Sequence, residues 1–130
     1  MKEQLKFYEY KLAFEIDSAD LFENLSTNTN IVVVDTRKQK AYEEAHIPGA
    51  ISFPHNEINI KITKDLDASK TYICYCDGIG CNGSTKGVLK MTKLGFKTKE
   101  LLGGLAWWKR DGYATEGNIP GSSKEVTCTC

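Results

Sequence analysis

The sequence predicts an α/β domain with a mainly parallel central sheet flanked by helices. The apolar run at residues 31–34 shows no alternation of polar and apolar side chains, and residues 71–75 form the second strong strand signal. Such runs are typical of parallel strands that are buried on both faces. Segments with apolar residues at helical spacing lie between the strands, which favours strand–helix crossovers. At 130 residues, 41% hydrophobic and 26% charged, the chain is long enough for one soluble globular domain.

Periodicity and turn residues predict the elements in chain order. Leu5, Tyr8 and Leu12 share one face of a first helix, and Asp17 or Ser18 is expected to cap a second. The predicted elements are a helix at 2–12, strand 14–16, helix 18–25, strand 31–34, helix 38–45, strand 51–53, a helix near 57–62, strand 71–75, helix 84–94, strand 100–102 and, after a break at Gly103-Gly104, a helix that runs through Arg110. We therefore expect an N-terminal helix (1–13), a domain (14–117) and a flexible tail (118–130) that carries Cys128 and Cys130.

Charge and cysteine usage narrow the function classes. The 17 basic and 17 acidic residues balance, so the overall charge predicts neither a nucleic acid nor a membrane as partner. No apolar run approaches the ~20 residues of a membrane span, and the N-terminus lacks the apolar centre of a signal peptide. We therefore expect a cytoplasmic protein. In a reducing compartment, its five cysteines are not expected to form a disulfide framework.

The loop that follows the second strong strand has the composition of an anion site. Cys76 ends the strand, glycines recur at positions 78, 80 and 83, and Ser84 is expected to open and cap a helix. Glycines let several backbone N–H groups converge, and a helix N-terminus lowers the pKa of a nearby thiol. This spacing favours Cys76 as a stabilised, accessible nucleophile. For Cys74, which lies within the strand, a buried structural role is the preferred interpretation.

Two segments resemble the rhodanese (sulfurtransferase) domain. The first is V-V-V-D-T-R-K-Q-K-A-Y-E-E-A-H-I-P-G-A-I-S-F-P, residues 32–54. The second is Tyr75-Cys76 with its loop, followed by L-G-F and by L-L-G-G-L-A-W-W-K-R-D-G-Y. In this order the motifs are highly specific, and they cover about residues 14–117. The loop is similar to that of a subset of the family with Cys-x4-Cys-Asn-Gly. The resemblance implies a rhodanese-like three-layer domain.

The resemblance also implies a single-domain sulfurtransferase in which Cys76 carries sulfane sulfur as a persulfide. Expected donors are thiosulfate or a persulfide, including one on a protein, and expected acceptors are cyanide or a thiol. Neither a cofactor nor a metal is implied, and the oligomeric state stays open. Asp35 and Arg37 are expected to support the site as a pair. The substrate-binding residues would be Asp77, Gly78, Ile79, Gly80, Cys81, Asn82, Gly83, Ser84 and Lys86.

Departures from the family pattern leave alternatives open. The loop holds Asp77 and no basic residue, so Lys86 would have to attract an anionic donor. Asn82 stands where related phosphatases carry arginine, which disfavours phosphate binding. Cys81 either resolves a Cys76 persulfide, forming a disulfide and releasing sulfide, or only fills space. The protein is then a sulfurtransferase, a thiol redox switch or a non-catalytic binding module. Cys128 and Cys130 could relay sulfur or bind a soft metal. The alternative is that they belong to a disordered tail and have no such role.

Overall fold

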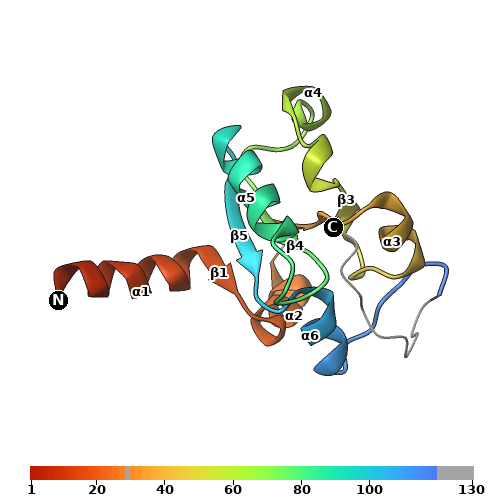
Figure 1. Cartoon of the computed structure of the whole chain (residues 1–130), viewed down its shortest axis with the longest axis horizontal. Coiled ribbons are helices and arrows are strands. Elements are labelled where there is room, and N and C mark those ends of the chain that lie inside the picture. Colours follow the sequence, from red (N-terminus) through yellow and green to blue (C-terminus); the bar gives the residue numbers. More distant parts are fainter. Residues whose placement is uncertain (29, 120–130) are drawn as a thin grey trace.

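The computed structural model describes residues 1–28 and 30–119 of the chain. Its centre is a five-stranded sheet in the order β1-β5-β4-β2-β3, and each neighbouring pair of strands is parallel. The strands are β1 (Glu15–Ile16), β2 (Ile31–Asp35), β3 (Ile51–Ser52), β4 (Thr71–Tyr75) and β5 (Lys97–Leu101). The predicted α/β class with a parallel central sheet is confirmed (Figure 1).

Helices cover both faces of the sheet. The helical elements are α1 (Lys2–Phe14), α2 (Ser18–Thr27), α3 (Gln39–Glu44), the 3₁₀ turn η1 (His55–Glu57), α4 (Ile60–Thr63), α5 (Gly83–Lys93) and α6 (Gly104–Arg110). On one face, Leu21 of α2 and Trp108 of α6 pack with Val33 and Ile73 of the sheet. On the other face, α5 contributes Met91 to a second cluster. The result is the three-layer arrangement that the resemblance implied.

Strand β4 supplies side chains to both layers because successive residues of a strand point to opposite faces. Ile73 and Tyr75 join the cluster under α2 and α6, while Tyr72 and Cys74 join the cluster under α5. Cys74 is fully buried, and this burial raises the pKa of its thiol to about 12. The structure thus bears out the structural role expected of Cys74.

Two element predictions were wrong in their bounds. β5 begins at Lys97 rather than at residue 100, because the polar residues Lys97, Thr98 and Lys99 pair with β4 although they lack an apolar pattern. The single helix expected near 57–62 is two short elements, η1 and α4. Asn59 interrupts it by accepting a hydrogen bond from the backbone N–H of Ile62, which starts a new helix.

The segment after the last helix is only partly described. The backbone N–H groups of Asn118 and Ile119 donate to the carbonyl oxygens of Glu43 and Glu44, so the first residues of the predicted flexible tail are hydrogen-bonded to α3. Cys128 and Cys130 lie outside the described residues, and the predictions about them stay predictions. Among the described helices, none is long and apolar enough to cross a bilayer.

Helix α1 forms as expected but packs unlike the other helices. The predicted face of Leu5, Tyr8 and Leu12 exists, yet no residue of α1 is buried. Figure 1 shows α1 leaving the domain at β1 and projecting away from it as a straight arm. The apolar pattern predicted the helix correctly, and the described part of the domain does not bury its apolar side chains.

Candidate active site

Cys76 lies at the carboxyl edge of the sheet, where ligands bind in parallel α/β folds. β4 ends at Tyr75, and the register pairs Tyr75 with Asp35, the last residue of β2. The two strands therefore end side by side, and the segments that follow them meet at this edge. Residues 77–82 form a loop between Cys76 and the start of α5 at Gly83.

A buried ion-pair network links these two segments. The Arg37 guanidinium donates to both carboxylate oxygens of Asp35, at 2.8 Å from Nη2 to Oδ2, and its Nη1 lies 3.3 Å from Oδ1 of Asp77. The Tyr75 hydroxyl also donates to Asp35, at 2.7 Å. All four side chains are buried. The expected pairing of Asp35 with Arg37 is observed, and it extends to the loop beside Cys76.

The network keeps Arg37 charged. Burial alone would lower the pKa of its guanidinium, but the hydrogen bond and the attraction of Asp35, with smaller effects of Tyr75 and Asp77, raise that pKa above its ordinary value. Burial and the neighbouring Asp35 raise the pKa of Tyr75 well above its usual value, so its hydroxyl stays protonated. Because Arg37 balances Asp77, the acidic residue of the loop is less repulsive to an anion than the sequence alone suggests.

The backbone on either side of the sulfur is held by helix α6. The N–H groups of Leu105 and Ala106 donate to the carbonyl oxygens of Cys76 and Asp77, at 2.9 and 2.8 Å. This contact requires glycine at position 104, where φ is +57° and a Cβ would overlap the carbonyl oxygen of Cys76. The glycine pair at the start of α6 therefore allows the helix to approach and hydrogen-bond the backbone of Cys76 and Asp77. The sequence did not indicate this role.

The other end of the loop is held by β5. Helix α5 begins at Gly83, one residue earlier than expected, and its N-cap residue Asn82 makes no side-chain capping bond. The prediction that Ser84 caps this helix was wrong, because its hydroxyl donates instead to Oε2 of Glu100, at 2.9 Å. The hydroxyl of Thr85 donates to the same oxygen. The first backbone N–H groups of α5 have no partner within the helix. They remain the donors suited to an anion at the loop.

The two cysteines of the loop lie together. The Sγ atoms of Cys76 and Cys81 and a carboxylate oxygen of Asp77 all lie within 4.8 Å of one another. Both cysteines are disulfide-bonded in this structure, and Cys76 is only 1% exposed. The prediction of an accessible Cys76 thiol is therefore not met in this oxidised state. The backbone N–H of Cys81 donates to the carbonyl oxygen of Gly78, so that amide does not point at a bound anion.

The remaining predicted residues lie around the rim of the loop. Ile79 is 76% exposed, and Lys86 is exposed on the first turns of α5. Burial, followed by the charges of Lys86 and Lys90, lowers the pKa of His55, which places positive potential on this side of α5. Sequence reasoning missed Glu100 and Gly104. A charged residue at the start of the predicted strand 100–102 and a double glycine before a helix were the signals available for them.

Comparison with known proteins identifies the family. The family model of the rhodanese-like domain matches residues 18–111. The chain belongs to the rhodanese-like family. The BH2092 protein of Bacillus halodurans has a crystal structure that is 41% identical to this chain, with an alignment that covers 97% of this chain and 93% of that chain, and it superposes with a TM-score of 0.92. A rhodanese-related protein of Thermoplasma volcanium is 27% identical over 79% of this chain and 97% of its own, with a TM-score of 0.67.

Relatives with named activities are larger proteins. The adenylyltransferase and sulfurtransferase UBA4 of Yarrowia lipolytica is 29% identical over 86 residues, which is 65% of this chain and 21% of that protein. An HTH-type transcriptional regulator of Mycobacterium tuberculosis is 28% identical over 90 residues, which is 69% of this chain and 39% of the regulator. A thiosulfate sulfurtransferase of Pseudomonas aeruginosa, at 24% identity and a TM-score of 0.70, shares the fold. The chain thus spans less than half the length of these two curated relatives.

Proposed function

We propose that this rhodanese-like protein is a sulfurtransferase in which the reduced Cys76 carries sulfane sulfur. The observation that carries the proposal is the placement of Cys76 at the carboxyl end of the central strand β4, between that strand and the N-terminus of α5. There the first N–H groups of the helix, which have no partner within the helix, favour an anion, whether the thiolate or a persulfide. The sulfurtransferase activity in the name of the larger Yarrowia relative supports the same class of reaction.

The reaction has two steps. The Cys76 thiolate attacks the outer sulfur of thiosulfate, an S–S bond forms at Cys76, the bond within thiosulfate breaks, and sulfite leaves with the electron pair. A nucleophile such as cyanide then attacks the outer sulfur of the persulfide, so that thiocyanate leaves and the Cys76 thiolate returns. A persulfide donor, on a small thiol or on a protein, would transfer its outer sulfur in the same way. Neither step requires a cofactor or a metal.

Residues around the loop have separate roles in this proposal. The backbone from Gly78 to Ser84 receives the transferred sulfur and the donor, with the first N–H groups of α5 as hydrogen-bond donors. Lys86 attracts an anionic donor toward the rim of the site. Asp35 and Arg37 touch neither donor nor sulfur in this scheme; they hold Asp77 and thereby the orientation of the loop.

The first test is a persulfide trap on the reduced protein. Wild type, Cys76→Ser and Cys81→Ser are reduced, freed of reductant, exposed to thiosulfate or to a low-molecular-weight persulfide, and examined by peptide mass spectrometry. We expect a gain of one sulfur on the Cys76 peptide of wild type and of Cys81→Ser, and no gain on that peptide in Cys76→Ser. Absence of the gain with both donors, in Cys81→Ser as well as in wild type, would leave a binding module as the function.

A second function is favoured by one observation, the disulfide-bonded state of the neighbouring Cys76 and Cys81. In a redox switch, the Cys81 thiolate attacks Sγ of the Cys76 persulfide, a Cys76–Cys81 disulfide forms, and hydrosulfide leaves. The same trap separates the two functions. Sulfide release with a disulfide-linked pair of peptides in wild type, against a stable persulfide in Cys81→Ser, would support the switch.

A further inference from the structure

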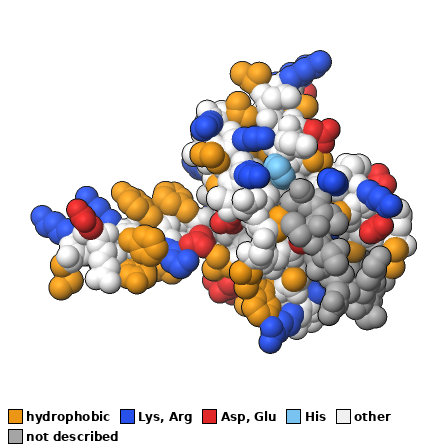
Figure 2. Space-filling model, in the orientation of Figure 1, with side chains coloured by type: hydrophobic (Ala, Val, Ile, Leu, Met, Phe, Trp, Pro, Cys, Tyr) orange, Lys and Arg blue, Asp and Glu red, His pale blue; other side chains and the backbone are white. Residues whose placement is uncertain are grey.

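The arm α1 exposes more large apolar side chains than any other helix described here. Leu5, Phe7, Tyr8, Tyr10, Leu12 and Phe14 are each between 52% and 82% exposed, and no residue of α1 is buried. Within the chain, the arm contacts β1 and β5, next to the point where it joins the domain. Figure 2 shows apolar side chains gathered along the arm, well separated from the body of the protein. Exposed apolar surface on this scale marks an interaction site.

The apolar residues of the arm form two stripes on opposite sides of the helix. At 100° per residue, Leu5, Tyr8 and Leu12 fall on one side, and Phe7, Tyr10 and Phe14 fall about 180° away. In the second stripe, the rings of Tyr10 and Phe14 stack with centroids 5.8 Å apart. A helix that is apolar on opposite sides is suited to burial between two partners. A helix that lies on a membrane surface carries one apolar face and one charged face instead.

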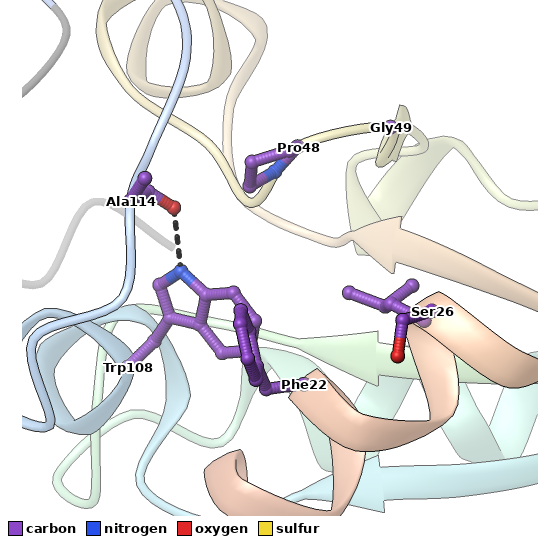
Figure 3. A pocket seen from close by; sticks show the side chains of 7 residues that line it. Phe22, Ser26, Pro48, Gly49, Trp108 and Ala114 are labelled. Carbon is purple, nitrogen blue, oxygen red and sulfur yellow. Dashed lines mark hydrogen bonds between the residues drawn. The ribbon is translucent and has the colours of Figure 1, made fainter.

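An apolar cavity on the domain could receive such a stripe. It has a volume of about 470 Å³ and is walled by Phe22 and Leu25 of α2, by the Pro48–Gly49 turn and by Trp108 of α6, with Ser26 and Ala114 at its edges. Figure 3 shows the indole of Trp108 and the ring of Phe22 side by side at this cavity, with the indole N–H bonded to Ala114. Phe22 is 51% exposed and Leu25 is 37% exposed, so both offer apolar surface to a partner.

The charges of the arm and of helix α2, which forms one wall of the cavity, are complementary. The exposed charges of α2 include Asp20 and Glu23, and α2 has no basic residue. The arm carries three lysines against two glutamates. Lys11 is paired with Glu15 at 2.8 Å, and Lys2 and Lys6 lie with Glu3 near the outer end of the arm, where the side chains carry one net positive charge. A basic arm end thus fits an acidic helix beside the cavity, which favours a second copy of this chain as the occupant.

The available area is sufficient for a stable dimer. Six side chains that are each more than half exposed would bury roughly 500 Å² per arm, given about 150–250 Å² for a fully buried aromatic residue. One stripe of each arm covers the other arm, so the two arms and the two cavity surfaces would together bury about 1,500 Å², within the ~1,200–2,000 Å² of standard interfaces. The Bacillus halodurans structure covers 97% of this chain. The uncovered 3% of 130 residues is about four residues, fewer than the 13 of α1, so that superposition includes most of the arm.

We infer that the protein forms a two-fold symmetric homodimer through exchanged arms. One apolar stripe of each α1 packs on the α1 of the other copy, and the opposite stripe docks at the partner's cavity beside α2. Both contacts occur twice in the dimer, as two-fold symmetry requires. The dimer leaves the Cys76 loop unoccupied by the partner, since neither α1 nor the cavity includes a residue of that loop.

Sedimentation velocity of the reduced full-length chain over a range of concentrations tests the inference. Wild type is expected to be a dimer under reducing conditions, which exclude disulfides between chains. Leu12→Glu and Tyr10→Glu, one in each stripe, should each raise the dimer dissociation constant by at least about tenfold, as expected for a large apolar side chain within an interface. Ile60→Glu is the matched control, because Ile60 of α4 is 76% exposed and belongs to neither surface. It should leave the dissociation constant within about twofold.

A charge exchange tests which surfaces meet. Lys2→Glu with Lys6→Glu, and separately Asp20→Lys with Glu23→Lys, should each weaken the dimer, whereas the four substitutions in one chain should restore it. A photo-crosslinker at position 8, in a mixture of light and ¹⁵N-labelled chains, should give mixed-isotope links either to α1 or to peptides that line the cavity. Circular dichroism checks that each variant is folded.

Several results would overturn the inference. They are a monomer at the highest soluble concentration, a dimer that is indifferent to the arm substitutions, or a combined charge variant that stays weakened. Sedimentation of the protein with vesicles of anionic phospholipid, lost in Leu12→Glu and accompanied by a monomer in solution, would reassign the arm to a membrane surface.

Discussion

Arg37 and Asp77 are joined across the carboxyl edge of the sheet, with Nη1 of the guanidinium 3.3 Å from Oδ1 of the carboxylate. The two residues are 40 positions apart, and Asp77 directly follows Cys76. The same guanidinium also donates to the carbonyl oxygen of Ala45, at 2.5 Å, and to Asp35. One side chain therefore fixes the ends of two strands and the segment that leads from β2 into α3.

Replacing Arg37 should cost far more stability than replacing an exposed cation. Arg37→Met leaves Asp35 and Asp77 buried without their countercharge, and loss of one partner of a buried ion pair costs about 3–5 kcal/mol. Lys11→Met is the control, since the Lys11–Glu15 pair is exposed and worth about 0–1 kcal/mol. Urea unfolding at neutral pH measures both. Equal losses for the two variants would contradict the role given to the network.

Gly104→Ala should destabilise the fold and disturb the loop. The residue has a positive φ, which costs a side chain about 1–2 kcal/mol, and a Cβ would also overlap the Cys76 carbonyl oxygen. Gly80→Ala is the matched control within the loop, because nothing lies within 4 Å of its Cβ position. We expect a loss of more than about 2 kcal/mol for Gly104→Ala and a change below about 1 kcal/mol for Gly80→Ala. Thermal unfolding of both variants gives the comparison.

The contribution of Glu116 to stability should depend on pH. The backbone N–H of Gly49 and the adjacent His46 lower the pKa of its carboxyl group below the ordinary 4.5. A carboxyl group with a lowered folded pKa contributes stability above its unfolded pKa and loses it as pH falls through its folded pKa. The difference in urea midpoint between wild type and Glu116→Gln should therefore be larger at about pH 5.5 than at about pH 3. A difference that grows on acidification would contradict this.

Cys74 should be the slowest cysteine of the β4–loop region to react. Its burial, with a smaller effect of Glu100, raises the pKa of its thiol to about 12, so almost none is thiolate at pH 8. In the reduced native protein, iodoacetamide at pH 8 should label Cys76 and Cys81 well before Cys74. Peptide mass mapping over time measures the order, and labelling in urea is the control because unfolding exposes all three. Early labelling of Cys74 would show that the strand opens locally.

The sequence was sufficient for the architecture because the architecture follows from local pattern. The runs at 31–34 and 71–75 predicted central parallel strands, and the apolar periodicity predicted α2, α5 and α6. Of the adjacent tryptophans, which cannot both face inward on a helix, Trp108 is buried and Trp107 lies half-buried under Arg110. The start of β5 was not predicted because Lys97 and Lys99 are polar and do not form an apolar pattern. Their place in the sheet is set by pairing with β4.

The candidate site was predicted from the contiguous loop after Cys76 and, for Asp35 and Arg37, from the resemblance to the family. The glycine spacing after Cys76 pointed to the loop and to the helix that follows it. The partners of the loop come from elsewhere, namely Arg37 from the segment after β2, Glu100 from β5 and Gly104 before α6. A single sequence gives spacing along the chain, whereas these contacts depend on strand order, which brings β2, β4 and β5 together. The roles of the site residues in sulfur transfer stay predictions.

The carboxylate of Glu100 has a mechanical consequence for the segment that carries Cys76. The carboxylate accepts hydrogen bonds from the hydroxyls of Ser84 and Thr85, which ties the start of α5 to β5. The backbone N–H groups of Leu105 and Ala106 tie Cys76 and Asp77 to α6 in the same way. Residues 78–82 lie between these two hydrogen-bonded segments. When a sulfur atom is added to Cys76, or a disulfide with Cys81 forms or breaks, the conformational change must therefore be confined to those five residues. The sheet itself is expected to move little.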